Sequence, residues 1–443
     1  MKYASTRGGP AISLDTALLE GIAPDGGLYL PQSLPRFSID DFSETEDLLS
    51  IAHRYLQPYF VGSELAEQLD DILQETFFFD IPVTPIPVES GSAQMLELFH
   101  GPTAAFKDVG AGFLAACISR LNEAGSDFAA TPLTILVATS GDTGGAVAAA
   151  FDGRPGVRVV VLYPDGRVSD RQARQLTCWS DNVLSLAVQG SFDDCQRLVK
   201  SAMADNVLNK RHRFSSANSI NIGRLLPQSI YYADASLRHY GATGNKPGFI
   251  IPTGNLGNAF ACVLAREAGL PVGEIVLATN ANTLIGDYLG GAEWLPRASI
   301  QTLASAMDVG DPSNMERLQK LKGDANALRD VVRVFSANDQ DIETEIKRTF
   351  DEYNLTICPH TATAMFTYRQ LTDDQRINND WVLVATAHAA KFESIVEPLI
   401  GASIPLPKGL SDILSRTSRF TRIEPDMRSL ETQLDLHAVT GDK

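Results

Sequence analysis

Short apolar runs alternate with helix-like segments along most of the chain. Runs rich in Val, Ile and Leu, bounded by Gly, Pro or Asp, predict buried strands at residues 95–99, 133–138, 157–162, 183–188, 249–251, 274–278 and 381–385. Between them, the apolar spacing predicts helices at residues 109–121, 146–151, 226–240 and 259–268. Near-continuous apolar strands separated by helices are typical of parallel sheets covered on both faces. The pattern therefore predicts an α/β fold.

The first 80 residues have a different pattern. Residues 18–21 predict a helix end, residues 23–35 form a Gly- and Pro-rich turn region, and residues 40–59 and 63–77 predict two amphipathic helices. Prolines at 82–87 follow. We therefore expect a mainly helical N-terminal domain over residues 1–80 and a catalytic α/β region over residues 81–443.

Length and composition are those of an ordinary globular protein. A chain of 443 residues exceeds a single core, which predicts roughly two or three domains. Hydrophobic residues make up 44% of the chain and charged residues 21%, which disfavours bulk disorder. The net charge of -17 argues against nucleic acid or an anionic membrane as a partner, because either would be repelled. An anionic substrate would need a local cluster of cationic side chains and backbone N–H groups.

The cysteines, the histidines and the apolar segments bear on the cellular location of the protein and on whether it binds a metal. The five cysteines are odd in number and contain no C-x-x-C pair, which predicts reduced thiols in a cytoplasmic protein. The N-terminus is not followed by an apolar export segment, and no run approaches the roughly 18 apolar residues that span a bilayer. The seven histidines lack ligand spacing, so we expect no metal.

Lys107 is the strongest candidate for chemistry. It follows Phe106 in a stretch of small and apolar residues, and the predicted helix at 109–121 comes directly after it. Most lysines are exposed, and an ordinary boundary lysine is the alternative. A desolvated lysine has a depressed pKa, and its free amine can attack a carbonyl. This context favours Schiff-base chemistry at Lys107.

Two glycine-rich junctions follow predicted strands. In residues 253–258, small residues let backbone N–H groups converge on an anion at the start of the next helix, although tight turns of this kind are common. The loop has neither a Walker lysine nor G-x-G-x-x-G spacing, so nucleotide binding is poorly supported. Residues 139–145 form the second junction. Residues 215–224 add Arg224, whose planar guanidinium suits a phosphate dianion but would also fit a polar surface turn.

These segments together resemble one enzyme family. Residues 100–108, His-Gly-Pro-Thr-Ala-Ala-Phe-Lys-Asp, resemble the pyridoxal phosphate attachment site of threonine synthases. Residues 1–8 and 21–31 resemble the N-terminal signature of the long-chain branch of that family. Further similar segments lie at residues 139–145, 215–227, 253–258, 306–314 and 385–392. The resemblance thus extends over nearly the whole chain.

The resemblance implies a fold, a cofactor and a reaction. It implies a fold-type-II enzyme with two α/β lobes around a cofactor cleft, added to the N-terminal helical domain. Pyridoxal phosphate would be held by Lys107, which would also serve as the proton base. The implied reaction converts O-phospho-L-homoserine and water into L-threonine and phosphate. Whether the chain is a monomer or a homodimer stays open.

The resemblance also implies individual site residues. Those expected to bind the cofactor are Phe106, Lys107, Asp142, Gly254, Asn255, Leu256, Gly257, Asn258 and Thr386, with the 254–258 loop on the phosphate and the Thr386 hydroxyl against the pyridine nitrogen. Those expected to bind the substrate are Thr103, Ser140, Gly141, Thr143, Gly144, Ser219, Asn221 and Arg224, with Arg224 on its phosphate.

Some positions depart from the family pattern or leave alternatives open. Asp142 stands where many relatives of the wider superfamily carry Asn, and a helix N-cap is an alternative role for it. Ala389 replaces a usual proline, and Cys358 replaces a common acidic residue. Two alternative functions are a phospholyase that releases a keto acid and a catalytically silent binding protein of the same fold. The joint presence of Lys107, Thr386 and the 254–258 loop argues against the silent protein.

Overall fold

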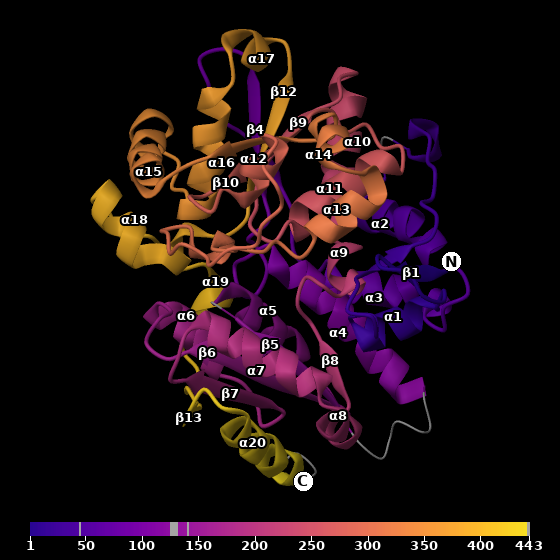
Figure 1. The fold of residues 1–443 in the computed structure, drawn as a ribbon. Coiled ribbons are helices and arrows are strands. Elements are labelled where there is room, and N and C mark those ends of the chain that lie inside the picture. Colours follow the sequence, from indigo (N-terminus) through magenta and orange to yellow (C-terminus); the bar gives the residue numbers. More distant parts are fainter. Residues whose placement is uncertain (44–45, 125–131, 140, 441–443) are drawn as a thin grey trace.

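The computed structural model describes residues 1–43, 46–124, 132–139 and 141–440. Two sheets, each packed between helices, form two α/β lobes (Figure 1). The N-terminal segment lies to one side, next to the helices between the lobes (Figure 1).

The first lobe contains a six-stranded sheet with strand order β11-β10-β9-β12-β4-β3. Its strands are β3 (Val83–Pro85), β4 (Ser92–Glu97), β9 (Gly248–Pro252), β10 (Ile275–Thr279), β11 (Arg333–Ser336) and β12 (Asp380–Ala385). All neighbours pair in parallel except the edge strand β3, which runs antiparallel to β4. The central strand β12 lies between β4 and β9, which places Val384 opposite Leu96 and Val382 opposite Phe249.

The helices of this lobe are α10 (Ser229–Thr243), α11 (Gly257–Glu267), α12 (Leu284–Leu289), η5 (Ser305–Met307), α13 (Met315–Lys322), α14 (Ala325–Arg329), α15 (Asp339–Tyr353), α16 (Pro359–Gln370), α17 (Asp373–Ile377), η6 (Ala389–Phe392) and α18 (Glu393–Ile400).

The second lobe contains a five-stranded, fully parallel sheet with strand order β13-β7-β6-β5-β8. Its strands are β5 (Leu133–Ala138), β6 (Val157–Pro164), β7 (Val183–Val188), β8 (Phe214–Ser216) and β13 (Thr421–Ile423). Its helices are α5 (Asp142–Phe151), α6 (Asp170–Thr177), α7 (Phe192–Ala204), α8 (Asn206–His212), α19 (Lys408–Leu414) and α20 (Met427–Thr440). The continuous apolar runs predicted as strands are buried here: every residue of β5 and β6 is buried.

The N-terminal segment is mainly helical, as predicted, with one small sheet that the pattern did not predict. Its elements are β1 (Tyr3–Ser5), α1 (Leu14–Glu20), β2 (Tyr29–Pro31), η1 (Ile39–Asp41), α2 (Leu48–Leu56), η2 (Gln57–Phe60), η3 (Ala66–Gln68) and α3 (Leu69–Thr76). The single helix predicted over 40–59 is wrong, because the Asp47 side chain caps a new helix by accepting from the N–H of Ser50. The helix predicted over 63–77 begins later, at Leu69.

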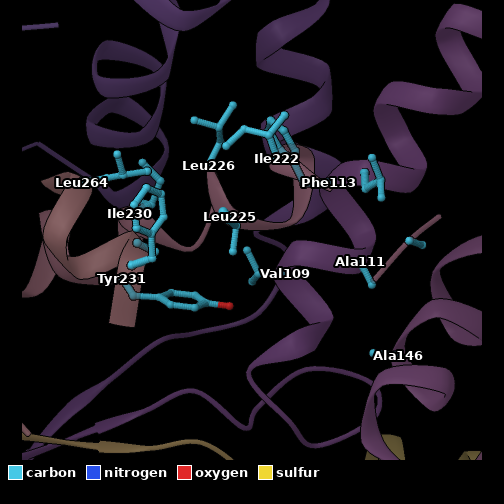
Figure 2. Packing of buried hydrophobic residues seen from close by; sticks show 14 of the residues in the cluster. Val109, Ala111, Phe113, Ala146, Ile222, Leu225, Leu226, Ile230, Tyr231 and Leu264 are labelled. Carbon is cyan, nitrogen blue, oxygen red and sulfur yellow. The ribbon is translucent and has the colours of Figure 1, made fainter. Parts of the chain in front are cut away.

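Two helices link the three parts of the molecule: α4 (Lys107–Ala124) and α9 (Ile222–Leu225). Figure 2 shows Val109 and Phe113 of α4 packed near Ile222 and Leu225 of α9. Phe113 also meets Phe60 of the N-terminal segment edge to face, with ring centroids 6.0 Å apart. The N-terminal segment thus shares one hydrophobic cluster with the catalytic region. This packing anchors α4, and the first residue of that helix is Lys107.

In the described part of the chain, no helix combines the length and apolar character needed to cross a membrane. All five cysteines lie in that part, where they are buried and free of disulfide bonds.

Candidate active site

A cavity of about 1350 Å³ opens where strands of both sheets end. Thr139 follows β5, Thr253 follows β9 and Thr386 follows β12, and all three line the cavity. Loops at the carboxyl ends of parallel strands commonly build such sites. The N-terminal segment contributes Arg7 and Pro24 to the wall, a contribution that the sequence analysis did not predict.

Lys107 enters this cavity from the first turn of α4 with only 14% of its side chain exposed. Burial lowers its pKa to about 8, Asp142 opposes that effect, and Lys391 and Arg224 add to it. The predicted desolvation is therefore confirmed. Near neutral pH a larger fraction of this amine is unprotonated than of an exposed lysine, and the unprotonated amine is the form that a nucleophile or a base requires.

Asp142 lies beside Lys107 in a buried ionic cluster. Its Oδ2 is 3.9 Å from Nζ of Lys107, and its Oδ1 is 2.9 Å from Nζ of Lys391. Burial raises the pKa of Asp142, but the two lysines overcome this effect and hold the pKa below its ordinary value. Gly141 occupies the N-cap position of α5. The alternative that Asp142 caps the helix is therefore wrong, because its carboxylate serves the lysines instead.

The loop at residues 253–258 forms a cup at the start of α11. Leu256, the N-cap of this helix, has a left-handed backbone with φ of 62°. A Cβ at Gly254 would lie 2.7 Å from Cα of Met307, so only glycine fits there without movement. Gly254, Asn255, Leu256, Gly257 and Asn258 all line the cavity, as the predicted cofactor loop requires.

Asn258 supplies a buried polar atom at the cup. Its Oδ1 accepts a hydrogen bond from the hydroxyl of Tyr232 at 2.7 Å, whereas its Nδ2 is buried without a hydrogen-bond partner in the protein. A buried unpaired donor is costly unless a ligand satisfies it. The free donor, the N–H groups at the helix start and the partly neutral Lys107 fit pyridoxal phosphate, which carries both a phosphate and an aldehyde.

Main-chain contacts bring Lys107 and Thr386 together. The N–H of Phe106 donates to the carbonyl oxygen of Thr386 at 2.8 Å, and the hydroxyl of Tyr231 donates to the carbonyl oxygen of Phe106 at 2.6 Å. Phe106 and Thr386 both line the cavity. The three predicted cofactor contacts at 106, 107 and 386 are thus neighbours, although β12 and α4 lie far apart in the sequence.

Three predicted substrate residues line the cavity: Thr143, Ser219 and Arg224. Arg224 is 2% exposed, and its guanidinium donates to the carbonyl oxygens of Ala217 and of Lys107, the latter at 3.5 Å. Burial lowers its pKa to about 10, so it remains a cation at neutral pH. Its Nε is buried without a hydrogen-bond partner in the protein.

Four other predicted substrate residues, Thr103, Gly141, Gly144 and Asn221, do not line the cavity, and Ser140 lies outside the described residues. The hydroxyl and N–H of Thr103 both donate to the Asp108 carboxylate. A Cβ at Gly144 would clash with Thr139, so this glycine serves close packing. The predicted substrate contacts at these positions stay predictions, because the positions of these residues in the structure do not support them.

Asn221 has an internal role. Its Nδ2 donates to the carbonyl oxygens of Leu18 and Ser216, and its Oδ1 caps α9 by accepting from the N–H of Gly223. A side chain whose donor and acceptor are both used in this way shapes the loop that presents Arg224.

Residues that the sequence analysis did not assign also build the site. Lys391 lies in the run Ala-Ala-Lys-Phe, a small and apolar setting like that of Lys107, and the same signal could have identified it. Arg317 is fully buried and donates to the carbonyl oxygens of Ser219 and Ile220. It braces the substrate loop from α13, a helix whose sequence carries no sign of that task.

His360 lines the cavity as a neutral side chain. Burial lowers its pKa to about 4. Its Nε2 lies 3.1 Å from the N–H of Ala306 and accepts from it, so the ring proton belongs on Nδ1. His360 thereby fixes the start of the 306–314 segment, whose Met307, Asp308 and Ser313 line the cavity. The described residues contain no group of three or more His, Cys, Asp or Glu that could hold a metal ion.

Comparison with known proteins places these features in one family. The family model described as pyridoxal-phosphate dependent enzyme matches residues 94–387. The models for the threonine synthase N terminus and C-terminal region match residues 2–77 and 361–433. Threonine synthase of Escherichia coli (strain K12) is 37% identical over 405 residues, covering 90% of this chain and 91% of that protein. Threonine synthase of Pseudomonas aeruginosa is 33% identical over 473 residues, covering 100% and 99%.

Solved structures of threonine synthases are similar to this chain over nearly its whole length. The pyridoxal-phosphate-bound threonine synthase of Brucella melitensis superposes with a TM-score of 0.89 at 32% identity, and covers 99% of both chains. The yeast threonine synthase superposes with a TM-score of 0.88 at 26% identity and the same coverage. The predicted fold class, a fold-type-II enzyme of two α/β lobes with an N-terminal mainly helical part, is confirmed. The chain belongs to the threonine synthase family of pyridoxal-phosphate-dependent enzymes.

Proposed function

We propose that this chain converts O-phospho-L-homoserine and water into L-threonine and phosphate, as a pyridoxal-phosphate-dependent carbon–oxygen lyase. The observation that carries the proposal is a single cavity that is lined by a partly neutral lysine, a glycine-rich loop at a helix start and a second, separate cation. Lys107, the 254–258 loop and Arg224 supply these three features. A phosphorylated amino acid and a phosphorylated cofactor together need two anion sites and one amine.

The cofactor, when bound, supplies the electron sink that stabilises negative charge on the substrate carbons. The residues of the chain bind the cofactor and the substrate and transfer protons. Lys107 would hold the cofactor through Nζ, and the same Nζ would accept and return protons during the reaction. The N–H groups at the start of α11 and the free Nδ2 of Asn258 hold the cofactor phosphate.

Arg224 and Ser219 bind the substrate phosphate in this proposal. The Ser219 hydroxyl accepts from Nδ2 of Asn255 at 2.6 Å, which couples the substrate loop to the cofactor loop. Thr386 places a neutral hydroxyl at the end of β12, where it would serve as a partner for the pyridine nitrogen without fixing a proton on that nitrogen. The buried free thiols support a cytoplasmic location for the reaction.

The test is to incubate the purified protein with O-phospho-L-homoserine and pyridoxal phosphate and to quantify L-threonine and phosphate. We expect equimolar products. Lys107→Ala should abolish the visible absorbance of the bound cofactor and reduce threonine formation by at least about 100-fold, because the proton base is also lost. Lys408→Ala is the matched control, because Lys408 is exposed and, among the described residues, pairs only with Asp412 on its own helix.

Other outcomes are decisive. Phosphate released together with a keto acid in place of threonine would identify a phospholyase. Cofactor binding without any turnover would identify a silent relative. A Lys107→Ala protein that keeps a borohydride-reducible adduct and full turnover would refute the assigned role of that lysine.

A further inference from the structure

Lys391 is a second buried lysine of the site, and nothing in the proposed reaction uses it. Its side chain is 1% exposed, and its Nζ donates to Asp142 Oδ1 at 2.9 Å and to the carbonyl oxygen of Thr103 at 2.7 Å. An ammonium is buried at this depth only when it is paired and hydrogen-bonded. Lys391 is therefore a fixed charge, held from two sides.

The Asp142 carboxylate is shared unequally between two lysines. Lys391 makes a direct charge-assisted hydrogen bond to one oxygen, whereas Nζ of Lys107 stands 3.9 Å from the other, beyond hydrogen-bond distance. Nε2 of Gln172 also lies 3.4 Å from the oxygen that Lys391 contacts. The carboxylate is thus turned toward Lys391.

The anchor of Lys391 is itself rigid. The Thr103 N–H donates to the Asp108 carboxylate at 2.9 Å, its hydroxyl donates to the same group, and its carbonyl oxygen accepts from Nε2 of Gln175 at 3.2 Å. Asp108 belongs to the first turn of α4, directly after Lys107. The network therefore returns to the helix that carries Lys107.

We propose that Lys391 is a positioning residue that takes up the charge of Asp142 and so leaves the Lys107 amine free to lose its proton. The inference rests on the proposed role of Lys107. Without Lys391, Asp142 would have Lys107 as its nearest cation, and in a buried site that pair would be strong. Lys107 would then be held as an ammonium, the form that can neither attack nor accept a proton.

The other charges around the pair do not replace Lys391. Lys107 is faced by Asp142, Lys391, Arg224 and Asp108. Asp142 is faced by both lysines and by His360, which is neutral near pH 7. Arg224 donates to backbone oxygens, so no other cation makes a hydrogen bond to the Asp142 carboxylate among the contacts of the described residues.

The test measures the protonation of Lys107 directly, in the full-length protein freed of cofactor. The protein is labelled with an amine-acylating reagent across neutral and alkaline pH, and the peptide that contains Lys107 is quantified by mass spectrometry. In Lys391→Met the midpoint of labelling should rise by about one pH unit or more, because the nearby opposite charge is no longer compensated. In Asp142→Asn it should fall, since burial, Lys391 and Arg224 then lower the pKa with only the weaker effect of Asp108 opposing them.

The double variant Lys391→Met/Asp142→Asn should return near the wild-type midpoint, because both charges are removed. Lys391→Arg, which keeps the charge, should retain most of the wild-type behaviour. Lys408→Met is the control for loss of an exposed lysine. An unchanged midpoint in folded Lys391→Met, checked by thermal melting, would overturn the proposal and leave Lys391 a purely structural role.

If Lys391→Met does not fold, Asp142→Asn remains informative, because it leaves no unpaired buried anion. A midpoint that does not fall in Asp142→Asn would equally overturn the proposal. The labelling uses neither substrate nor cofactor, so it separates two failures. If the wild-type protein forms no threonine but the two variants show their midpoint shifts, the proposed function is refuted and the role of Lys391 is left intact.

Discussion

Phe106 and Thr386 are joined through their main chains: the N–H of Phe106 donates to the carbonyl oxygen of Thr386 at 2.8 Å. The N–H of His388 donates to the carbonyl oxygen of Ala104 at 3.0 Å, and Ala105 bridges Ala387 in the antiparallel sense. This short bridge sets Lys107 against the end of β12. Because only backbone atoms take part, side-chain substitutions at 386 should leave the bridge in place.

Replacing Thr386 by Ala should therefore remove the hydroxyl and leave the backbone bridge unchanged. We expect cofactor affinity to fall by about 1 kcal/mol, or roughly fivefold, for one lost hydrogen bond, with slower turnover and a nearly unchanged melting temperature. Thr386→Ser is the matched control, since it keeps the hydroxyl. Fluorescence titration of the cofactor-free proteins measures the affinity. Equal affinities of all three proteins would show that another residue faces the ring nitrogen.

Gly254→Ala should distort the cofactor loop. The added Cβ would lie 2.7 Å from Cα and 2.9 Å from the carbonyl oxygen of Met307, and backbone atoms cannot move aside cheaply. We expect cofactor affinity to fall by about 1–3 kcal/mol, about 5- to 150-fold. Gly112→Ala is the matched control, because a Cβ there meets nothing within 4 Å and alanine favours the helix. Similar cofactor affinity in the two variants would contradict the role of the loop.

Arg224→Ala should weaken the reaction of O-phospho-L-homoserine. Loss of a charge-assisted hydrogen bond predicts a decrease of about 10- to 150-fold in kcat/KM. Vinylglycine lacks the phosphate, so its conversion to threonine without inorganic phosphate should change much less. Steady-state kinetics on both compounds give the comparison within one variant.

Arg224 also donates to the carbonyl oxygen of Ala217, so Arg224→Ala removes a structural contact as well as a cation. A control that keeps the cation is therefore needed. Arg224→Lys keeps a cation near the phosphate and should lose less than Arg224→Ala on the phosphorylated substrate. Equal losses on both compounds would mean that Arg224 supports the loop or the cofactor. No loss on either compound would place the substrate phosphate elsewhere.

His360 should make the fold sensitive to acid. Burial lowers its pKa from 6.5 to about 4, so between these values the unfolded chain binds a proton that the folded chain does not. The free energy of unfolding should therefore fall as the pH falls through that window, by about 3 kcal/mol from this group. His360→Gln, which keeps an acceptor for the N–H of Ala306, should lack this contribution. Urea unfolding of both proteins at several pH values tests this, and parallel curves would contradict it.

Local pattern was sufficient for the three central strands of the second lobe, β5, β6 and β7, and for the apolar setting of Lys107. Strands β5 and β7 have their predicted bounds, because a strand buried on both faces must be apolar at nearly every position. The same logic identified Lys107, a charge among small and apolar neighbours. The pattern failed at residues 40–59, where one polar side chain, Asp47, starts a new helix.

The sequence by itself determined that the chain forms an α/β fold, where its central buried strands lie and that Lys107 has an apolar setting, because these properties depend on near neighbours. Only the tertiary structure decided which side chains meet. It placed Lys391 on Asp142 and turned Thr103 toward Asp108, away from the cavity. It also closed one wall with Arg7 of the N-terminal segment. Such contacts depend on which strand ends lie side by side, and the order of the strands follows from the packing of the whole chain.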